Sequence, residues 1–389
     1  MTYLWPLNVI APNFEPGTVG GSGEVMVQLT DCFLRQHSNV RIYLNQNAAK
    51  RFPQWSDHII KIRTASMDRP MSKAVAMFQL ALGGGRFLPS DGISWFPFGA
   101  IMPFHFRGKG VVTIHDTLDR DLPAYVPIAD RCFRSIMIPR TTRRCAVITD
   151  SGFSRNRIRL HYGVEATVVP LASVPLPPPI SIEVPSRPYV FYAANGWPHK
   201  NHKFLLETWC RDTRLRKIAF VFTLGPKLGL LGPLVNRARR QGIEVILTGR
   251  LSPSELAAYY KGAICSVLPS LYEGFGLTVQ ESLSANCPVV VSECAGLTES
   301  IPSGYPFILP LKHDKWAETI LSIQRDRPTD LQRWVTSTTW TEVATEYLKV
   351  FDLVDKGARK GELVSSGVFQ PPHHSSDHPD RQREAQLPV

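Results

Sequence analysis

The sequence of 389 residues lacks several features that mark secreted or membrane-spanning proteins. No apolar run reaches the ~18 residues that a membrane-spanning helix needs, so we expect any contact with a membrane to be peripheral. The N-terminus has no basic segment followed by a long apolar core, which predicts no signal peptide. The seven cysteines are odd in number and form no C-x-x-C pair. We expect them to be reduced core residues of a cytoplasmic protein, with neither a disulfide framework nor a zinc site.

Positive charge is in excess. The chain has 44 lysines and arginines against 33 aspartates and glutamates, which gives a net charge of +11. This sign favours anionic partners such as phosphates, nucleic acids or an acidic membrane surface. Basic runs such as RTTRR and NRARR come with no recognised nucleic-acid-binding motif, so we predict no nucleic-acid partner.

Short apolar runs of strand length alternate with helical patterns along most of the chain. This alternation predicts parallel sheets that are covered on both faces. A proline-rich stretch without periodicity interrupts the pattern, which then restarts. We therefore predict an α/β protein with two Rossmann-like domains that face a central cleft. The expected division is a first domain at 1–172, a linker at 173–188, a second domain at 189–339, a terminal helix at 340–354 and a disordered polar tail at 355–389.

The stretch PSLYEGFGLTVQESLSANCPVVVS is the most informative part of the sequence. It predicts a loop that leaves a buried strand and enters a helix, with Glu273 in the loop and Glu281 in the second helical turn. Ligands bind at the carboxyl ends of parallel strands, and a helix N-terminus attracts phosphate. Gly274 and Gly276 are expected to let the backbone approach a ligand closely. The two glutamates could also be ordinary acids near a helix N-terminus, which the helix dipole favours.

The longer block LPSLYEGFGLTVQESLSANCPVVVSECAGLTE resembles the donor-site block of the retaining glycosyltransferases of family 4, which have the GT-B fold. The resemblance implies that Glu273 holds hydroxyl groups of the donor sugar and that Glu281 holds the ribose of the nucleotide. It also implies that the backbone N–H groups of Phe275, Gly276 and Leu277 stabilise the leaving diphosphate.

Two further segments of the second half resemble the same family. YAANGWPHKNHKFLLE is similar to the segment in which a lysine reaches the donor diphosphate, and Lys200 takes that place. Where the family often has an arginine on the diphosphate, this chain has Asn195. LTGRLSPSELAAYYKGA resembles the stretch beside the nucleotide base, which makes Gly249, Arg250 and Leu251 candidates. Arg250 is equally consistent with a solvated surface arginine.

The first half resembles the family more loosely. TVGGSGEV is similar to a glycine-rich loop that closes on the donor phosphates, with Gly21 and Ser22 as candidates. VVTIHDTLDRDLP places His115 where the family has a histidine that faces the transferred sugar, and a histidine that only caps its own loop is the alternative. VITDSGFSRNRI resembles a segment in which Ser151 and Arg155 would serve phosphate or acceptor.

The triplet DRD at 119–121 is similar to the metal-diphosphate motif of the other large glycosyltransferase fold. We interpret it as coincidental here. In GT-B proteins helix N-termini and basic side chains replace a metal as counter-charge, so we predict no metal and no cofactor. The helix at 340–354 resembles the GT-B helix that crosses back to the first domain, and Glu299 is expected to be structural.

The resemblance implies a retaining hexosyltransferase with His115, Glu273 and Lys200 as catalytic residues. Its donor would be a nucleotide-diphosphate sugar and its acceptor a saccharide or a lipid-linked saccharide. The segment ANGWPHKNH is most similar to bacterial mannosyltransferases of polysaccharide assembly, so GDP-mannose is favoured over a UDP-sugar. The basic charge is consistent with peripheral attraction to the anionic inner face of the membrane. It is equally consistent with ordinary solvated surface charge. Two further alternatives are a catalytically inactive GT-B partner, which Asn195 leaves open, and a sugar-nucleotide epimerase on the same fold.

Overall fold

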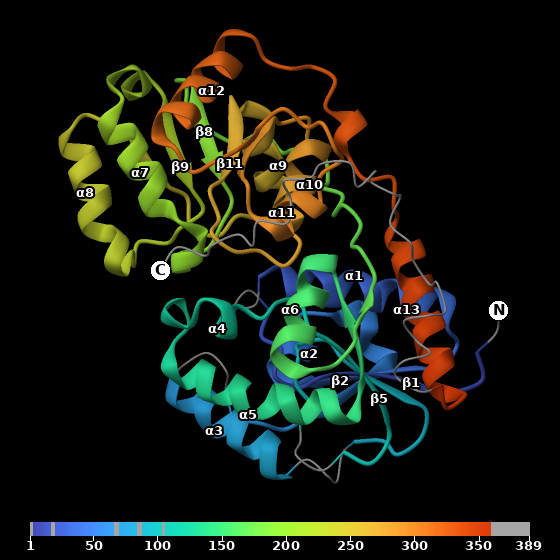
Figure 1. Cartoon of the computed structure of the whole chain (residues 1–389). Coiled ribbons are helices and arrows are strands. Elements are labelled where there is room, and N and C mark those ends of the chain that lie inside the picture. The colour runs from blue at the N-terminus through green and yellow to red at the C-terminus, as the bar shows by residue number, and fades with distance from the viewer. Residues whose placement is uncertain (1–2, 17–19, 66–69, 84–87, 103–105, 359–389) are drawn as a thin grey trace.

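The computed structural model describes residues 3–16, 20–65, 70–83, 88–102 and 106–358. Two domains, each built on a parallel sheet, lie one above the other and are joined by an extended segment (Figure 1). This confirms the predicted α/β fold with two Rossmann-like domains. The part of the predicted tail from 359 onward lies outside the described residues.

The first sheet has seven strands in the order β3-β2-β1-β4-β5-β6-β7. All of its strand pairs are parallel. The strands are β1 (Leu7–Ala11), β2 (Val40–Asn45), β3 (Ile59–Ile62), β4 (Ile93–Phe96), β5 (Lys109–Thr113), β6 (Ala146–Thr149) and β7 (Thr167–Val168). The α-helices are α1 (Gly21–Gln36), α2 (Gln46–Ala49), α3 (Pro70–Gly83), α4 (Leu118–Asp121), α5 (Ile128–Arg144) and α6 (Gly152–Tyr162), with 3-10 turns at Pro53–His58 and Pro123–Tyr125.

The second sheet has six parallel strands in the order β10-β9-β8-β11-β12-β13. The strands are β8 (Tyr189–Tyr192), β9 (Ala219–Phe222), β10 (Val245–Leu247), β11 (Cys265–Leu268), β12 (Val289–Ser292) and β13 (Ile308–Leu309). The α-helices are α7 (His202–Arg211), α8 (Gly232–Arg240), α9 (Pro253–Gly262), α10 (Leu277–Ser284), α11 (Ala295–Glu299) and α12 (His313–Arg325). The 3-10 turns are Pro198–Lys200, Thr213–Lys217, Gly229–Leu231 and Gln332–Trp334.

Local sequence explains where several of these elements begin and end. The central strands β8, β9, β11 and β12 are buried along their whole length, as expected for a sheet covered on both faces. Ser252 and Glu255 form a capping box at the start of α9. After α10, Asn286 has φ of +54°, a conformation that asparagine tolerates, and Pro288 prevents further helix.

The last helix, α13 (Trp340–Asp355), returns to the first domain and packs against α1 and β5. Figure 1 shows it alongside the lower domain. Its buried Tyr347 and Phe351 belong to the same core cluster as Phe33 and Trp95 of the first domain. The predicted crossing helix is confirmed, and it ends one residue later than expected.

Two details differ from what sequence patterns suggest. Helical apolar spacing begins at Val25, but α1 begins at Gly21, although its first turn GSGE has low helix propensity; of this turn Gly23 is buried, and Gly21 lies beside Leu277 of α10. The expectation that the cysteines are core residues is wrong for Cys132, which is exposed, and for Cys210, which is partly exposed. Cys132 lies on the solvent-facing side of α5, whose buried residues are all further along the helix. Within the described ranges, no helix is both long and apolar enough to cross a membrane.

Candidate active site

A salt bridge between Lys200 and Glu273 lies at the carboxyl end of the second sheet. Lys200 follows β8 and Glu273 follows β11, and these strands are adjacent and parallel, so their following loops meet. Nζ of Lys200 lies 2.6 Å from Oε1 of Glu273, and the Ser270 hydroxyl donates to the same oxygen at 2.7 Å. The two charged side chains are 21% and 10% exposed, so both are shielded but still reachable by a ligand.

The glycines after Glu273 are required by contacts within the protein. A Cβ on Gly274 would collide with the backbone carbonyl of His115 in the first domain. Gly276 has φ of +88° and occupies the N-cap of α10, a left-handed conformation that favours glycine. We expected both glycines to admit a ligand. The structure shows that Gly274 instead admits the backbone of the other domain.

Two helix N-termini meet at the boundary between the domains. α10 begins after Gly276 and α1 begins after Gly20, and no side chain caps either helix. A Cβ added to Gly21 would lie 3.4 Å from Cδ1 of Leu277, so the two first turns are close neighbours. Figure 1 shows α1 directly below α10 and α11. Ser22 lies in the first turn of α1. Two positive dipole ends at one place favour an anionic ligand.

Glu281 lies in the second turn of α10, near Glu24 in the first turn of α1. Burial raises the pKa of the Glu281 carboxyl to about 7, and the charge of Glu24 acts in the same direction, while the Tyr260 hydroxyl partly opposes them. Near neutral pH this carboxyl is therefore poised between its charged and neutral forms. Hydroxyl groups of a ligand that donate to it would favour the charged form.

Both ring nitrogens of His115 are bound within the first domain. Nδ1 lies 2.5 Å from the carboxylate of Asp150, and Nε2 lies 3.0 Å from the carbonyl oxygen of Pro97. Both partners accept hydrogen bonds, so the ring is protonated and donates twice. Burial would lower the pKa of His115, but Asp150 outweighs burial and raises it. The ring nitrogens thus face the protein, although the carbonyl of His115 touches the site through Gly274.

The remaining candidates of the second domain lie along the same sheet edge. A Cβ on Gly20 would lie 3.7 Å from Nδ2 of Asn195, so Asn195 reaches the glycine-rich turn before α1. Gly249, Arg250 and Leu251 follow β10, which is three positions from β11 in the sheet. At ~4.8 Å per strand this is roughly 14 Å from Glu273. The structure therefore places this loop too far away to contact Glu273.

A pocket of about 480 Å³ opens between the domains. Residues 124–128 of the first domain line one side, and residues 195–198 of the second domain line the other. Trp197 is 38% exposed and Ile128 is 74% exposed. Pro198, which lines the pocket, begins the 3-10 turn that ends at Lys200.

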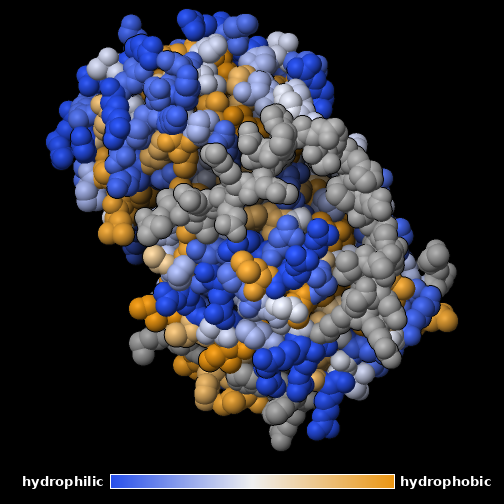
Figure 2. All heavy atoms as spheres, in the orientation of Figure 1, coloured by the Kyte–Doolittle hydropathy of each residue, from blue (hydrophilic) through white to orange (hydrophobic). Residues whose placement is uncertain are grey.

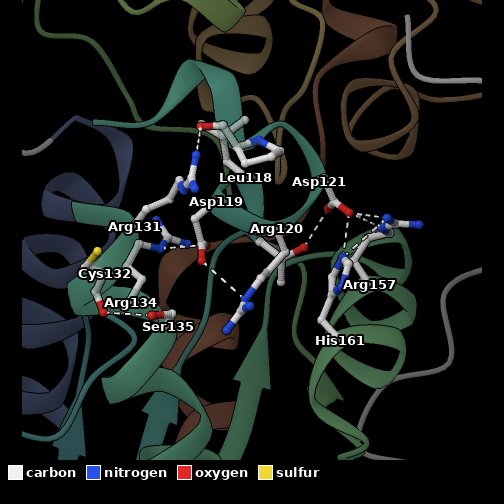
Figure 3. A network of polar contacts seen from close by, with 12 residues as sticks. Leu118, Asp119, Arg120, Asp121, Arg131, Cys132, Arg134, Ser135, Arg157 and His161 are labelled. Carbon is white, nitrogen blue, oxygen red and sulfur yellow. Dashed lines mark hydrogen bonds and ion pairs between the residues drawn. The ribbon is translucent and has the colours of Figure 1, made fainter. Parts of the chain in front are cut away.

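The two aspartates of the DRD triplet are engaged in ion pairs (Figure 3). Asp119 lies 2.7 Å from Nε of Arg134 and 3.7 Å from Arg120. Asp121 binds Arg157 and lies 2.6 Å from Nε2 of His161. Burial would raise the pKa of Asp121, but these hydrogen bonds outweigh burial and lower it. Among the residues that the structure describes, no group of three or more His, Cys, Asp or Glu could hold a metal ion.

Three contacts between the domains involve side chains whose partners the sequence does not reveal. Glu299 accepts hydrogen bonds from the backbone N–H groups of Gly152 and Phe153 at 2.6 and 2.7 Å, and so caps α6 of the other domain. Ser151 donates to the carbonyl of Gly274 at 2.6 Å. Tyr272 donates to Asp121 at 2.7 Å. The loop that carries Glu273 is therefore held from both domains.

Residues 187–326 match the family model described as glycosyl transferases group 1. The chain carries a group 1 glycosyl transferase domain. Two relatives are O-antigen chain mannosyltransferases: RfbU of Salmonella typhimurium, 24% identical over 55% of this chain, and mannosyltransferase B of Escherichia coli, 30% identical over 40%. The matches span 60% and 39% of those two proteins. These matches confirm the resemblance at the level of group 1 glycosyl transferases.

Solved structures share the fold of the whole chain. A sucrose-phosphate synthase from Thermosynechococcus elongatus is 16% identical with a TM-score of 0.67, and the match covers 91% of this chain and all of that one. Anabaena Alr3699/HepE, solved in complex with UDP-glucose, is 14% identical with a TM-score of 0.59, covering 93% of this chain and all of that one. Around its group 1 glycosyl transferase domain, the chain therefore has the complete two-domain GT-B fold.

Proposed function

We propose that this chain is a retaining glycosyltransferase of family 4 that moves a hexose from a nucleotide-diphosphate sugar to a saccharide or lipid-linked saccharide. The observation that carries the proposal is the shielded Lys200–Glu273 pair beside two uncapped helix N-termini. The two O-antigen chain mannosyltransferases among the relatives favour mannose, GDP-mannose as donor and a role in bacterial surface polysaccharide assembly. A cytoplasmic location is part of the proposal.

In this proposal the salt bridge keeps both charges compensated until the donor arrives. The donor diphosphate would then bind Lys200 and the backbone N–H groups of residues 275–277. The sugar hydroxyls would donate hydrogen bonds to Glu273. Glu281 would accept hydrogen bonds from the ribose. The loop Gly249–Leu251 suits the base, because it lies roughly 14 Å along the sheet edge from Glu273.

The proposed transfer occurs on one face of the sugar. The bond between C1 and the phosphate oxygen breaks while the acceptor oxygen bonds to C1 on the same side. The acceptor proton passes to the leaving diphosphate oxygen. His115 would contribute the fixed positive charge of its protonated ring and its carbonyl contact with Gly274, since both ring nitrogens bind other groups.

For the acceptor we propose the pocket between residues 124–128 and 195–198. Its exposed Trp197 offers an aromatic face to a sugar ring, and its walls carry no charged side chain. Trp197→Ala should raise the KM for acceptor without changing nucleotide affinity. Leu160→Ala, at a 65% exposed position of α6 outside both proposed surfaces, is the control, and equal KM values for the two variants would contradict this location.

Peripheral contact with an anionic membrane is also proposed. Val75, Phe78 and Leu82 on α3 are exposed, as is Ile136 on the arginine-rich α5, and the two helices share one core cluster. Figure 2 shows hydrophobic surface over this lower part of the first domain. Sedimentation with anionic and with neutral vesicles tests it: binding to anionic vesicles that high salt removes is expected, and no sedimentation with either would contradict it.

A thermal-shift panel of nucleotides and nucleotide sugars in EDTA tests the donor site. A rise in Tm with GDP-mannose or a UDP-sugar is expected, and it identifies the base. The prediction that no metal is needed fails if the shift appears only after Mg²⁺ or Mn²⁺ is added. An inactive partner would bind no donor or never turn it over, and an epimerase would convert the donor sugar without releasing the nucleotide.

A further inference from the structure

Tyr272 comes directly before Glu273 in the loop of the second domain, but its side chain is buried in the first domain. It is 2% exposed and clusters with Leu118, Leu122 and Val126. Its ring meets Phe153 edge-on, with 5.4 Å between the ring centroids. Burial of a whole aromatic ring in the partner domain fixes the backbone on either side of it.

The hydroxyl of Tyr272 is also fixed, by hydrogen bonds to the first domain. It donates to Oδ2 of Asp121 at 2.7 Å, and the backbone N–H of Thr117 donates to it at 3.3 Å. Asp121 in turn accepts from Thr117, Arg157 and His161, so its carboxylate is charged and fully occupied. Figure 3 shows Arg157 and His161 converging on Asp121. A hydrogen bond to such a carboxylate is stronger than one between neutral groups.

Residues on both sides of Glu273 are therefore tied to the first domain. Tyr272 is bound by Asp121, and the carbonyl of Gly274 is bound by the Ser151 hydroxyl at 2.6 Å. Glu273 itself points back to Lys200 of its own domain. Contact between the domains thus fixes the backbone on both sides of Glu273, while Lys200 and Ser270 hold its carboxylate.

We propose that Tyr272 and Asp121 are a positioning pair that couples closure of the two domains to the placement of Glu273. The inference rests on the proposed function, since Glu273 is taken to hold the donor sugar. Among the described residues, the partners of the pair lie in the first domain and include none of the proposed nucleotide-binding residues. Its loss should therefore affect the reaction of the sugar and leave nucleotide binding intact.

The test compares Tyr272→Phe with Tyr305→Phe. Tyr305 is a buried tyrosine of the second domain, 5% exposed, and within the described part of the chain its hydroxyl bonds to the backbone of Val289 alone. The probes are GDP-mannose and UDP-glucose, with water as acceptor. Tyr272→Phe should lower kcat for nucleotide release about tenfold and keep the nucleotide Kd within about twofold, whereas Tyr305→Phe should leave both unchanged.

A double variant with Asp121→Asn adds a second criterion. If the two residues act as a pair, the kcat of the double variant should be at most about twofold below that of the slower single variant. If Asp121→Asn fails to fold, the comparison of Tyr272→Phe with Tyr305→Phe still tests the inference. Equal kcat values for those two variants, or a joint change of kcat and Kd in Tyr272→Phe, would overturn the inference. A wild-type protein that binds no nucleotide would instead overturn the proposed function.

Discussion

Replacing Glu281 by glutamine should change both stability and donor affinity in a way that depends on pH. The pKa of Glu281 rises from the usual 4.5 to about 7, first because of burial and second because of Glu24. Since the folded pKa lies above the unfolded one, the stability that this group contributes is present below pH 4.5 and is lost as the pH rises through 7. A shift of this size corresponds to roughly 3 kcal/mol at most. Glu281→Gln should therefore raise Tm at pH 8 and change it little at pH 4.5.

Donor affinity should follow the opposite course in the wild-type protein. If ribose hydroxyls donate to the Glu281 carboxylate, only its charged form binds well, and that fraction rises from about 10% at pH 6 to about 90% at pH 8. The Kd for a nucleotide sugar should fall roughly tenfold over this range. Isothermal titration calorimetry with a nucleotide sugar would measure this Kd, because the diphosphate of the ligand does not titrate between pH 6 and pH 8. A flat profile, or the same slope in Glu281→Gln, would refute the reasoning.

Four further substitutions test other parts of the site. Lys200→Ala and Glu273→Ala should each lower nucleotide release from the donor by at least about a hundredfold with little change in circular dichroism, and rates near wild type would refute their roles. Trp197→Ala should raise the acceptor KM several-fold in a transfer assay. Gly274→Ala should lower Tm by several degrees, because the added carbon meets the backbone of the first domain. Gly225→Ala, whose added carbon has no neighbour within 4 Å, should not, and equal losses would contradict this.

The sequence predicts the parts of the site that belong to one domain. Glu273 and Lys200 follow strands of one parallel sheet, and the ends of such strands always share an edge, so their proximity can be inferred from order and periodicity. The end of α10 follows from Asn286, which tolerates a left-handed conformation, and from Pro288, which cannot continue the helix. The order of the strands and the residue types in each loop are enough to predict these features.

Contacts across the domain boundary could not be predicted in this way. Nothing in the loop after β11 reveals that Tyr272 would bind Asp121, or that Gly274 would face the backbone of His115 rather than a ligand. Within the first domain, the sequence also does not reveal that Asp150 binds the ring of His115. These pairs are separated by between 35 and 159 residues in the chain, and only the relative placement of elements brings them together.

The return of α13 to the first domain determines when that domain can fold. Tyr347 and Phe351 complete a core that contains Phe33 and Trp95, so about three hundred residues separate parts of one core cluster. During synthesis, the first domain must wait for nearly all of the second before its core can close. A fragment that ends at the linker should expose apolar surface and aggregate. Adding α13 as a separate peptide should restore its solubility.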